Sequence, residues 1–257
     1  MGMEKDLESP GAMASAAVLK AAKKELRMSM KQKLSSITAK SIDAQSAAIF
    51  KNITSSKLYR EARRIGIYLS MPTGEVQTDA IVRHALKSGK QVFVPYLHKA
   101  QYPPPDTPRS VMDMVDLRSL LDYESLERDS WGIPTINVKT VDQRERILED
   151  AKEKEALDLI LMPGVAFQRD ESTGFVKRLG HGKGFYDYFL HRYRESRGSR
   201  VEEPSKNPGT DVLLYGLALE EQLLGVTEEL PIGKHDSLLH GLVIGDGRLV
   251  EPAIKGA

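Results

Sequence analysis

Runs of apolar residues, separated by amphipathic stretches, set the pattern of this chain. The runs at 65–71, 91–95, 157–162 and 212–219 are almost continuously apolar, which is typical of strands buried on both faces. The run at 111–117 predicts a further strand, at an edge of the same sheet. Strands that alternate with helical stretches in this way favour a mainly parallel sheet.

Apolar residues between these runs recur with the period of an α-helix. In the first such stretch, 18–34, they fall at Leu19, Ala22, Leu26 and Met30, which predicts an amphipathic helix. Further helical segments are predicted at 41–53, in a short stretch up to 62, at 79–88, in the strongly charged stretch 142–156, from 186 onward and as a short turn at 220–224.

The segment 65–95 has the pattern of a βαβ unit. Thr78 is a residue type favoured at the N-cap of the helix 79–88, and Gly89 is favoured directly after its end. A strand, a helix and a second strand at this spacing imply a right-handed parallel crossover. The sequence therefore predicts an α/β fold with its helices packed on the sheet.

The domain organisation follows from composition along the chain. We expect a disordered leader at 1–14 and a single α/β domain over 15–257. The polar segments 98–110 and 195–211 are rich in Pro, Gly or charge and are expected to be insertions. The segment 242–250 predicts a terminal hairpin.

Composition excludes several classes of function. Lys plus Arg number 37 and Asp plus Glu number 36, so no overall field attracts nucleic acid or anionic lipid. The absence of Cys excludes a disulfide framework, a zinc–thiolate site and a cysteine nucleophile. No apolar stretch is long enough to span a membrane, and the N-terminus lacks the pattern of a secretory signal. We expect a cytoplasmic protein, and a monomer rather than an oligomer.

The stretch 178–187 carries the strongest chemical signal. Gly180, Gly182 and Gly184 alternate within it, just before a predicted helix. A glycine-rich turn that leads into a helix presents free backbone N–H groups to an anion, and flanking cations suit phosphate oxygens. The spacing matches neither the P-loop nor the dinucleotide fingerprint. The alternative is a surface loop with solvated charges, in which Asp187 merely favours the helix start.

Three other features have two interpretations each. Lys23 and Arg27, with Lys31, lie on one flank of the first helix, either as a solvated face or as a cationic ridge directed at phosphate. Glu75 follows a strand's carboxyl end, where open α/β sheets bind ligands, but it could be an ordinary loop acid. Trp131, the only tryptophan, is either a core residue or a stacking platform for a flat ligand.

Several of these segments occur together, in order, in a known family. They are Lys23-x-x-x-Arg27, Tyr68-Leu69-Ser70-Met71 with Glu75 and Thr78, Trp131-Gly132-Ile133-Pro134, Met162-Pro163-Gly164-Val165-Ala166-Phe167, Arg178-Leu179-Gly180-x-Gly182-Lys183-Gly184-Phe185-Tyr186-Asp187, and Asp236 after Leu230-Pro231. With these anchors the chain resembles the 5-formyltetrahydrofolate cyclo-ligases, also called methenyltetrahydrofolate synthetases, from about Ala21 to about Ile244.

The resemblance implies a three-layer α/β/α fold and an ATP-dependent reaction. In the family, 5-formyltetrahydrofolate becomes 5,10-methenyltetrahydrofolate, with release of ADP and phosphate. The formyl oxygen is phosphorylated first, and N10 of the folate then attacks the activated carbon. Such a reaction needs no enzyme nucleophile, because phosphoryl transfer depends on positioning and charge neutralisation.

The resemblance also implies a role for each matched residue. The nucleotide side would comprise Lys23, Arg27, Arg178, Leu179, Gly180, His181, Gly182, Lys183, Gly184, Phe185 and Tyr186, with Arg178 and Lys183 acting on the transferring phosphoryl group. Leu69, Met71, Glu75, Trp131 and Phe185 would line the folate pocket. Asp187 and Asp236 would bind Mg²⁺. His181 is expected at the rim.

Two positions depart from the family pattern. Phe185 stands where tyrosine is frequent, and His240 stands near an expected acid, which puts a metal-side role of that region in doubt. Two other functions remain open at this point: a non-catalytic relative that binds nucleotide or folate, and a sugar-phosphate isomerase or deaminase on a similar scaffold.

Overall fold

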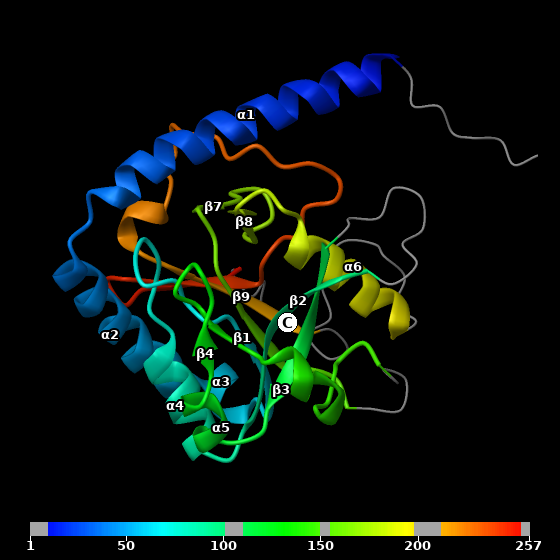
Figure 1. Cartoon of the computed structure of the whole chain (residues 1–257). Coiled ribbons are helices and arrows are strands. Elements are labelled where there is room, and N and C mark those ends of the chain that lie inside the picture. The colour runs from blue at the N-terminus through cyan, green and yellow to red at the C-terminus, as the bar shows by residue number, and fades with distance from the viewer. Residues whose placement is uncertain (1–9, 101–109, 150–154, 198–211, 253–257) are drawn as a thin grey trace, which may run out of the picture.

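A seven-stranded sheet forms the centre of the molecule, in the order β11-β10-β9-β6-β1-β2-β3 (Figure 1). The computed structural model describes residues 10–100, 110–149, 155–197 and 212–252. The strands of this sheet are β1 (Arg64–Ile67), β2 (Gln91–Lys99), β3 (Ser110–Leu117), β6 (Leu159–Met162), β9 (Leu213–Ala218), β10 (Gly241–Ile244) and β11 (Leu249–Val250).

The strand pairing is parallel at the centre and antiparallel at both edges. β1 pairs in parallel with β2 on one side and with β6 on the other, and β6-β9-β10 continue in parallel. β3 and β11 join the two edges as antiparallel strands. The chain leaves β1 towards β2 but returns to the other side of β1 as β6. The carboxyl ends of β1 and β6 therefore form a topological switch point, where such sheets bind ligands.

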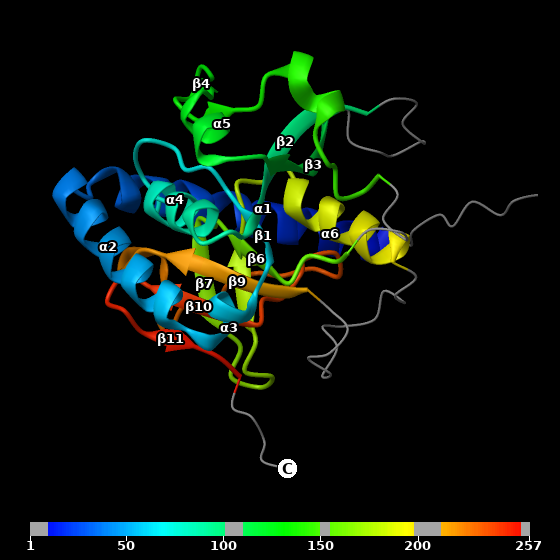
Figure 2. The same cartoon turned by 90° about the horizontal axis from the view of Figure 1, so that it is seen from below.

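Helices cover both faces of the sheet (Figure 2). On one face lie α2 (Ala39–Ser55), α3 (Lys57–Glu61) and α4 (Asp79–Lys87), and on the other lies α6 (Phe185–Ser196). Alternate residues of each strand point to opposite layers, so Leu161 belongs to the first apolar core and Ile160 to the second. This confirms the predicted α/β fold with a mainly parallel sheet between helices. None of the helices that the structure describes is long and apolar enough to cross a bilayer.

The remaining elements lie around this frame. α1 (Pro10–Ser35) runs along one end of the sheet, above a hairpin of β7 (Ala166–Arg169) and β8 (Val176–Leu179) (Figure 1). A second small hairpin, β4 (Glu127–Arg128) and β5 (Pro134–Thr135), follows α5 (Leu120–Glu124). Two 3₁₀ helices, η1 (Val138–Gln143) and η2 (Glu220–Gln222), complete the described elements.

Most predicted elements are present, and the terminal hairpin is confirmed by the β10–β11 pair. Gly89 has the positive φ of 73° expected after α4. Thr78 occupies the N-cap position but does not cap the helix with its side chain, because its hydroxyl donates to the carbonyl of Tyr68 at 2.7 Å.

The expected leader at 1–14 was too long. α1 begins at Pro10, so residues 10–14 are helical. Proline suits the first turn of a helix, and the alanine-rich stretch after it has high helix propensity. Residues 1–9 lie outside the described residues. Of the expected insertions, 98–99 belong to β2, Ser110 to β3 and 195–196 to α6, while 101–109 and 198–211 lie outside the described residues.

The predicted solvated helix at 142–156 was wrong in its described part. After η1 the chain is irregular up to 149, and it runs beside the edge strand β3. The backbone N–H of Ile147 donates to Met114 O at 3.0 Å, and the N–H of Asp116 donates to Glu145 O at 3.0 Å. Pairing with an edge strand satisfies its free backbone groups, and this outweighs the helical preference of a charged segment.

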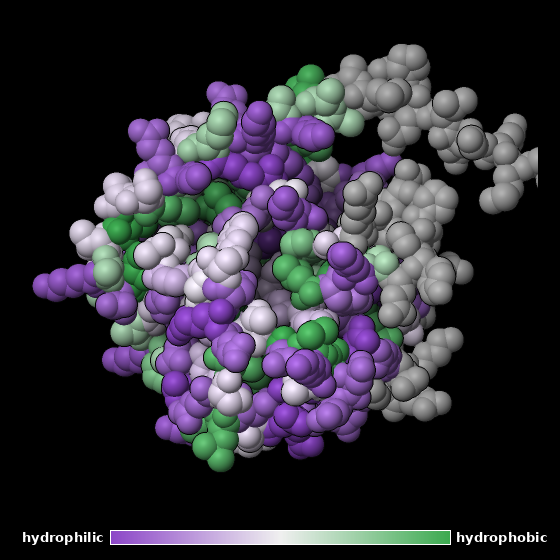
Figure 3. Space-filling model, viewed as in Figure 1, coloured by the Kyte–Doolittle hydropathy of each residue, from purple (hydrophilic) through white to green (hydrophobic). Residues whose placement is uncertain are grey.

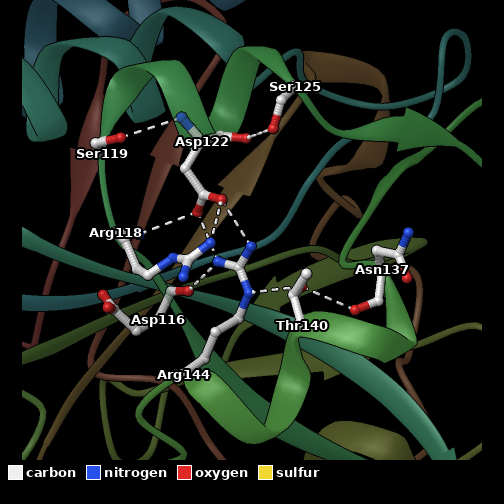
Figure 4. Close-up of polar contacts among 8 residues, drawn as sticks. All are labelled: Asp116, Arg118, Ser119, Asp122, Ser125, Asn137, Thr140 and Arg144. Atoms are coloured by element: carbon white, nitrogen blue, oxygen red, sulfur yellow. Dashed lines mark hydrogen bonds and ion pairs between the residues drawn. The ribbon is translucent and has the colours of Figure 1, made fainter.

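Arg144, within that segment, joins a buried ionic network (Figure 4). Its guanidinium donates to both carboxylate oxygens of Asp122, at 2.6 and 2.7 Å, and to the carbonyl of Asp116 at 2.9 Å. The Arg144 side chain is only 2% exposed and that of Asp122 9%. Burial alone would raise the pKa of Asp122, but hydrogen bonds and charges of Arg144 and Arg118 outweigh it, so the pKa is lowered.

Replacement of Arg144 by Met should therefore destabilise the fold strongly. Removal of one member of a buried ion pair leaves its partner uncompensated, which typically costs about 3–5 kcal/mol. The free energy of unfolding, measured by urea denaturation, should fall accordingly. As a control, Lys57→Met removes a partner of the exposed Lys57–Glu61 pair and should change stability little. Equal effects of the two substitutions would contradict the structural role given to Arg144.

Candidate functional site

The glycine stretch forms the turn between β8 and α6. Gly182 and Gly184 have φ of 88° and 68°, a region that L-residues with side chains rarely adopt. A Cβ on Gly180 would lie 2.8 Å from a guanidinium nitrogen of Arg178, and one on Gly182 would lie 3.1 Å from the guanidinium carbon of Arg27. The glycines thus let two cations approach the backbone closely. The first N–H groups of α6, which have no partner within a helix, follow directly.

The first helix brings its basic flank to this turn. Nε of Arg27 donates to Gly180 O at 2.7 Å, and Nζ of Lys23 forms an ion pair with Asp236. Burial lowers the pKa of Arg27, and the nearby charge of Asp236 opposes that shift. Lys31, on the same flank, is exposed. The structure therefore places Lys23 and Arg27 at the turn and leaves Lys31 on the solvated face.

Apolar contacts fix this helix in place. Met30, with Leu26 beside it, packs in a cluster that contains Leu179, the last residue of β8. The other members of the cluster are Val165, Ala166, Leu224 and Leu230. The side chain of Leu179, predicted on the nucleotide side, is thus part of the core, and its backbone carbonyl accepts from Val165 N at 2.6 Å.

Arg178 occupies the centre of the site. Its side chain is 4% exposed, and a guanidinium nitrogen lies 3.3 and 3.4 Å from the carboxylate oxygens of Asp187. The other terminal nitrogen donates to Pro163 O at 3.3 Å, directly after β6. Arg178 therefore connects the end of a central strand to the first turn of α6.

The two predicted metal ligands are brought together. The backbone N–H of Ser237 donates to Asp187 at 3.1 Å, which places Asp187 beside the residue that follows Asp236. Asp236 also accepts from Gly233 N at 2.6 Å. Within the described part of the chain, no group of three or more acidic or histidine side chains is placed to hold a metal ion. Two carboxylates suit Mg²⁺, which typically uses one or two of them together with phosphate oxygens and water.

Lys183 and His181 lie exposed in the turn. Partial loss of hydration lowers the pKa of His181, and the positive charges of Arg178 and Arg27 lower it further. His240 is placed elsewhere: its Nδ1 accepts from Leu214 N at 3.0 Å, and its ring packs edge-on against Phe175. These contacts tie His240 to the start of β9.

The loop after β1 supplies a second group of predicted residues. Glu75 is 5% exposed and accepts from Met71 N at 2.5 Å. Burial raises the pKa of Glu75 to about 7, although the Met71 N–H opposes the shift. The side-chain amide of Gln77 donates to the carbonyls of Met71 and Glu75, both at 3.0 Å. Leu69 is buried beside them. The loop is therefore stabilised by hydrogen bonds between its own residues, and the carboxyl group of Glu75 is buried within it.

Trp131 is on the surface, 69% exposed, in the turn between β4 and β5. Its backbone N–H donates to Asp129 at 2.8 Å. A Cβ on the next residue, Gly132, would lie 2.7 Å from Cγ of Pro72, so this turn packs against the residue that follows Met71. The interpretation of Trp131 as a core residue is thus wrong, and its exposed side chain belongs to a turn that packs against the loop carrying Glu75.

Tyr186 joins the two groups. The guanidinium carbon of Arg178 lies 5.4 Å from the centre of its ring. Burial raises the pKa of Tyr186; the charge of Arg178 opposes the shift and that of Glu75 adds to it. Its neighbour Tyr68, to which no role was assigned from the sequence, is buried and donates to Val76 O at 3.1 Å. Tyr68 belongs to the apolar run 65–71 and Tyr186 begins a predicted helix, and neither pattern indicates that the two lie together.

The combined site lies at the switch point of the sheet. The Glu75 loop follows β1, and Arg178 binds the carbonyl that follows β6. Seen from the side used for Figure 1, the surface is hollowed beneath α1 (Figure 3). Two further hollows, of about 580 and 380 Å³, lie elsewhere, beside Gln45 and beside Asp116 respectively, and none of the predicted site residues lines them.

Comparison with known proteins indicates the family of this chain. A model of the 5-formyltetrahydrofolate cyclo-ligase family matches residues 19–245. A probable 5-formyltetrahydrofolate cyclo-ligase of Caenorhabditis elegans is 34% identical over 218 residues, which cover 85% of this chain and 90% of the relative. The 5-formyltetrahydrofolate cyclo-ligase of Mus musculus is 31% identical over 223 residues, with coverage of 86% and 93%.

A solved structure has the same fold. The NMR structure of Aquifex aeolicus 5,10-methenyltetrahydrofolate synthetase superposes with a TM-score of 0.60 at 22% identity, covering 91% of this chain and 94% of that one. The resemblance inferred from the ordered motifs is therefore confirmed at the level of family and fold. The chain belongs to the 5-formyltetrahydrofolate cyclo-ligase family.

Proposed function

We propose that this protein converts 5-formyltetrahydrofolate to 5,10-methenyltetrahydrofolate at the expense of ATP, which is released as ADP and phosphate. The observation that carries the proposal is a single charged site assembled from distant segments. Lys23 and Arg27 from α1, Arg178 from β8 and Asp187 from α6 meet Asp236 around the glycine turn. Beside them lies a loop with a buried carboxyl group, at Glu75.

The two parts of the site suit the two substrates. The glycine turn, with Lys23, Arg27, Arg178 and Lys183, offers backbone N–H groups and cations to the phosphates. Glu75 offers an acceptor to the N–H donors of the pterin, and exposed Trp131 offers an aromatic face. Leu69, Met71 and Phe185 supply apolar contact. Arg178 and Tyr186 lie at the junction, where the terminal phosphate would meet the formyl group.

The chemistry requires charge neutralisation more than covalent help. The γ-phosphoryl group passes from ATP to the formyl oxygen, and ADP leaves. N10 then attacks the formyl carbon and loses its proton, while the carbon–oxygen bond breaks and phosphate leaves with the oxygen. Arg178 and Lys183 stabilise the charge that spreads over the transferring group. No nucleophilic side chain is needed at any step.

Asp187 and Asp236 are the residues that would hold Mg²⁺. When bound, the ion would neutralise phosphate oxygens and orient the terminal phosphate. These carboxylates also form ion pairs, Asp187 with Arg178 and Asp236 with Lys23. The backbone N–H groups of Ser237 and Gly233 donate to Asp187 and Asp236 respectively, which helps to fix the two carboxylates.

A coupled assay tests the proposal against a non-catalytic binding role and against an ATP-independent isomerase. Purified protein is incubated with 5-formyltetrahydrofolate and Mg·ATP, and ADP release is followed together with the absorbance of the methenyl product. We expect ADP and the methenyl product in equal amounts. No ADP should be released without 5-formyltetrahydrofolate, and no methenyl product should form without ATP. Binding of both substrates without ADP release would leave only the non-catalytic role.

Lys183→Ala should slow turnover by about 10²–10³, as for loss of one donor that stabilises developing charge. The fold should be unaffected, because Lys183 is exposed in the turn. Single-turnover rates and thermal unfolding of the variant measure the two effects. Lys51→Ala, which removes an exposed lysine from α2, serves as the control. A wild-type rate in Lys183→Ala would remove Lys183 from the mechanism.

Asp187→Asn should raise the Mg²⁺ concentration needed for half-maximal activity by about tenfold or more, because the substitution removes a charged ligand. A tenfold change corresponds to about 1.4 kcal/mol of binding free energy. Activity should recover in part at high Mg²⁺. Titration of the rate with Mg²⁺ at saturating substrates measures this. Asp43→Asn, an exposed site on α2, should show the wild-type curve. An unchanged curve for Asp187→Asn would contradict metal binding there.

Folate binding should strengthen as pH rises towards about 7, the pKa to which burial raises Glu75. Below that value the free protein carries a protonated Glu75. Pterin N–H donors favour the ionised carboxylate, so binding lowers the pKa and releases a proton. Calorimetry in buffers of different ionisation enthalpy counts this proton. The same shift implies that Glu75 lowers stability as pH rises from its ordinary pKa to about 7, because over that range the unfolded chain gives up the proton that the buried carboxyl group retains.

Glu75→Gln is the matched variant for that measurement. It keeps the shape of the side chain but cannot release a proton, so its folate affinity should be lower and should not change with pH in this range. Wild-type affinity that is constant from about pH 5 to about pH 8 would contradict a titrating carboxyl group at the pterin.

A further inference from the structure

The hydroxyl of Tyr186 is a buried polar group that the mechanism above does not use. Its oxygen is shielded from solvent and has no hydrogen-bond partner among the described residues. Buried hydroxyls in folded proteins are nearly always paired, because an unpaired one loses its bonds to water without replacement. Phenylalanine would avoid this cost with the same ring. The hydroxyl therefore lacks a partner that the described residues could provide.

The neighbours of Tyr186 indicate where that partner lies. Arg178 packs its guanidinium over the ring, with the carbon 5.4 Å from the ring centre. On another side, Glu75 is close enough for its charge to act on Tyr186, and buried Tyr68 interacts electrostatically with both. Glu75 accepts from Met71 N and Tyr68 donates to Val76 O, and neither forms a hydrogen bond with the Tyr186 hydroxyl. Tyr186 thus lies between Arg178 and the Glu75 loop.

We propose that the Tyr186 hydroxyl donates a hydrogen bond to the ring carbonyl of the bound pterin. The inference rests on the proposed function and deepens it. In a pterin, the exocyclic amino group and the ring amide N–H are donors, and the ring carbonyl beside them is an acceptor. A carboxylate such as Glu75 matches the donors but repels the carbonyl. A hydroxyl next to Glu75 supplies the donor that the carbonyl needs.

This contact would also orient the reacting group. The formyl nitrogen lies next to the ring carbonyl on the same side of the bicyclic ring. If Tyr186 holds the carbonyl, the formyl group is directed towards Arg178, which lies across the Tyr186 ring. Tyr186 is then a specificity-determining and positioning residue on the folate side, although the motif that contains it was assigned to the nucleotide.

A second tyrosine on the same helix provides a matched control. The hydroxyl of Tyr193 is also buried, but it accepts a hydrogen bond from Leu157 N at 2.9 Å. Tyr193→Phe removes a hydroxyl that has a hydrogen-bond partner, whereas Tyr186→Phe removes a hydroxyl that has none among the described residues. The two substitutions are chemically identical and should have opposite consequences.

Calorimetry and thermal unfolding of both variants test the proposal. For Tyr186→Phe we expect the Kd for 5-formyltetrahydrofolate to rise about tenfold or more, because the ligand's carbonyl is left unpaired. Its Kd for Mg·ATP should not change, and its Tm should be equal to that of the wild type or higher. For Tyr193→Phe we expect a lower Tm and unchanged Kd values. A purely structural role cannot produce the first pattern.

A ligand analogue provides an independent readout. The analogue carries an amino group in place of the ring carbonyl, so it presents a donor to Tyr186; the adjacent ring N–H becomes an acceptor, and the part of the discrimination that Tyr186→Phe removes is therefore the diagnostic quantity. The wild type should bind it more weakly than 5-formyltetrahydrofolate, and Tyr186→Phe should reduce that discrimination.

Three results would overturn the proposal. Equal folate affinity of the wild type and Tyr186→Phe would exclude the contact, and a weaker affinity for Mg·ATP alone would place the hydroxyl at the nucleotide. If the wild type bound no folate at all, the proposed function itself would fail, and this inference with it. The first two results leave the proposed function standing, so the two failures can be told apart.

Discussion

The buried guanidinium of Arg178 is the group on which the arrangement of the site depends. A cation taken out of water is costly unless charged and polar partners surround it. Arg178 finds them in Asp187, at the start of α6, and in the carbonyl of Pro163, at the end of β6. The same side chain covers one face of the Tyr186 ring. The end of a central strand, the start of a helix and the Tyr186 ring are therefore held in one geometry by one side chain.

The proposed nucleotide side depends on contacts between opposite ends of the chain. Lys23 reaches Asp236, and Arg27 reaches the carbonyl of Gly180. Neither contact can form until α1 has docked on the β7–β8 hairpin through Leu26 and Met30. The apolar stripe of this helix thus has a functional consequence, because it places the basic flank at the glycine turn. A helix with the same charges but a weaker stripe would leave them in solvent.

Local patterns predicted those parts of the molecule that local physics determines. The buried strands were recognisable because both faces are apolar, and Gly89 because only a left-handed residue ends α4 in this way. The glycine turn at 180–184 was recognisable for the same reason. The segment around Arg144 was not, since its charges are exposed in an isolated helix but paired with Asp122 and the edge strand in the fold. Periodicity cannot distinguish a solvated charge from a buried pair.

The sequence also did not predict the direction in which a side chain points between two elements. Tyr186 stands inside a motif that resembles a nucleotide site, and its neighbours in the chain are glycines and Asp187. Its place near Glu75, which stands more than a hundred residues earlier in the chain, arises from tertiary structure. Family motifs therefore predicted a set of site residues, but they could not divide it into a nucleotide side and a folate side.

Two ion pairs of the site bear on which form of the nucleotide it suits. Lys23 and Arg178 are both paired with carboxylates, so these two cations do not stand as uncompensated charges. On the proposed function, a nucleotide without metal would compete with Asp236 and Asp187 for these cations and leave the carboxylates unpaired. A nucleotide that carries a divalent cation replaces both partners at once, because its phosphates take the cations while its metal takes the carboxylates. The pairing therefore favours the metal–nucleotide complex over the free nucleotide, and the preference arises from charges that the folded chain has already brought together.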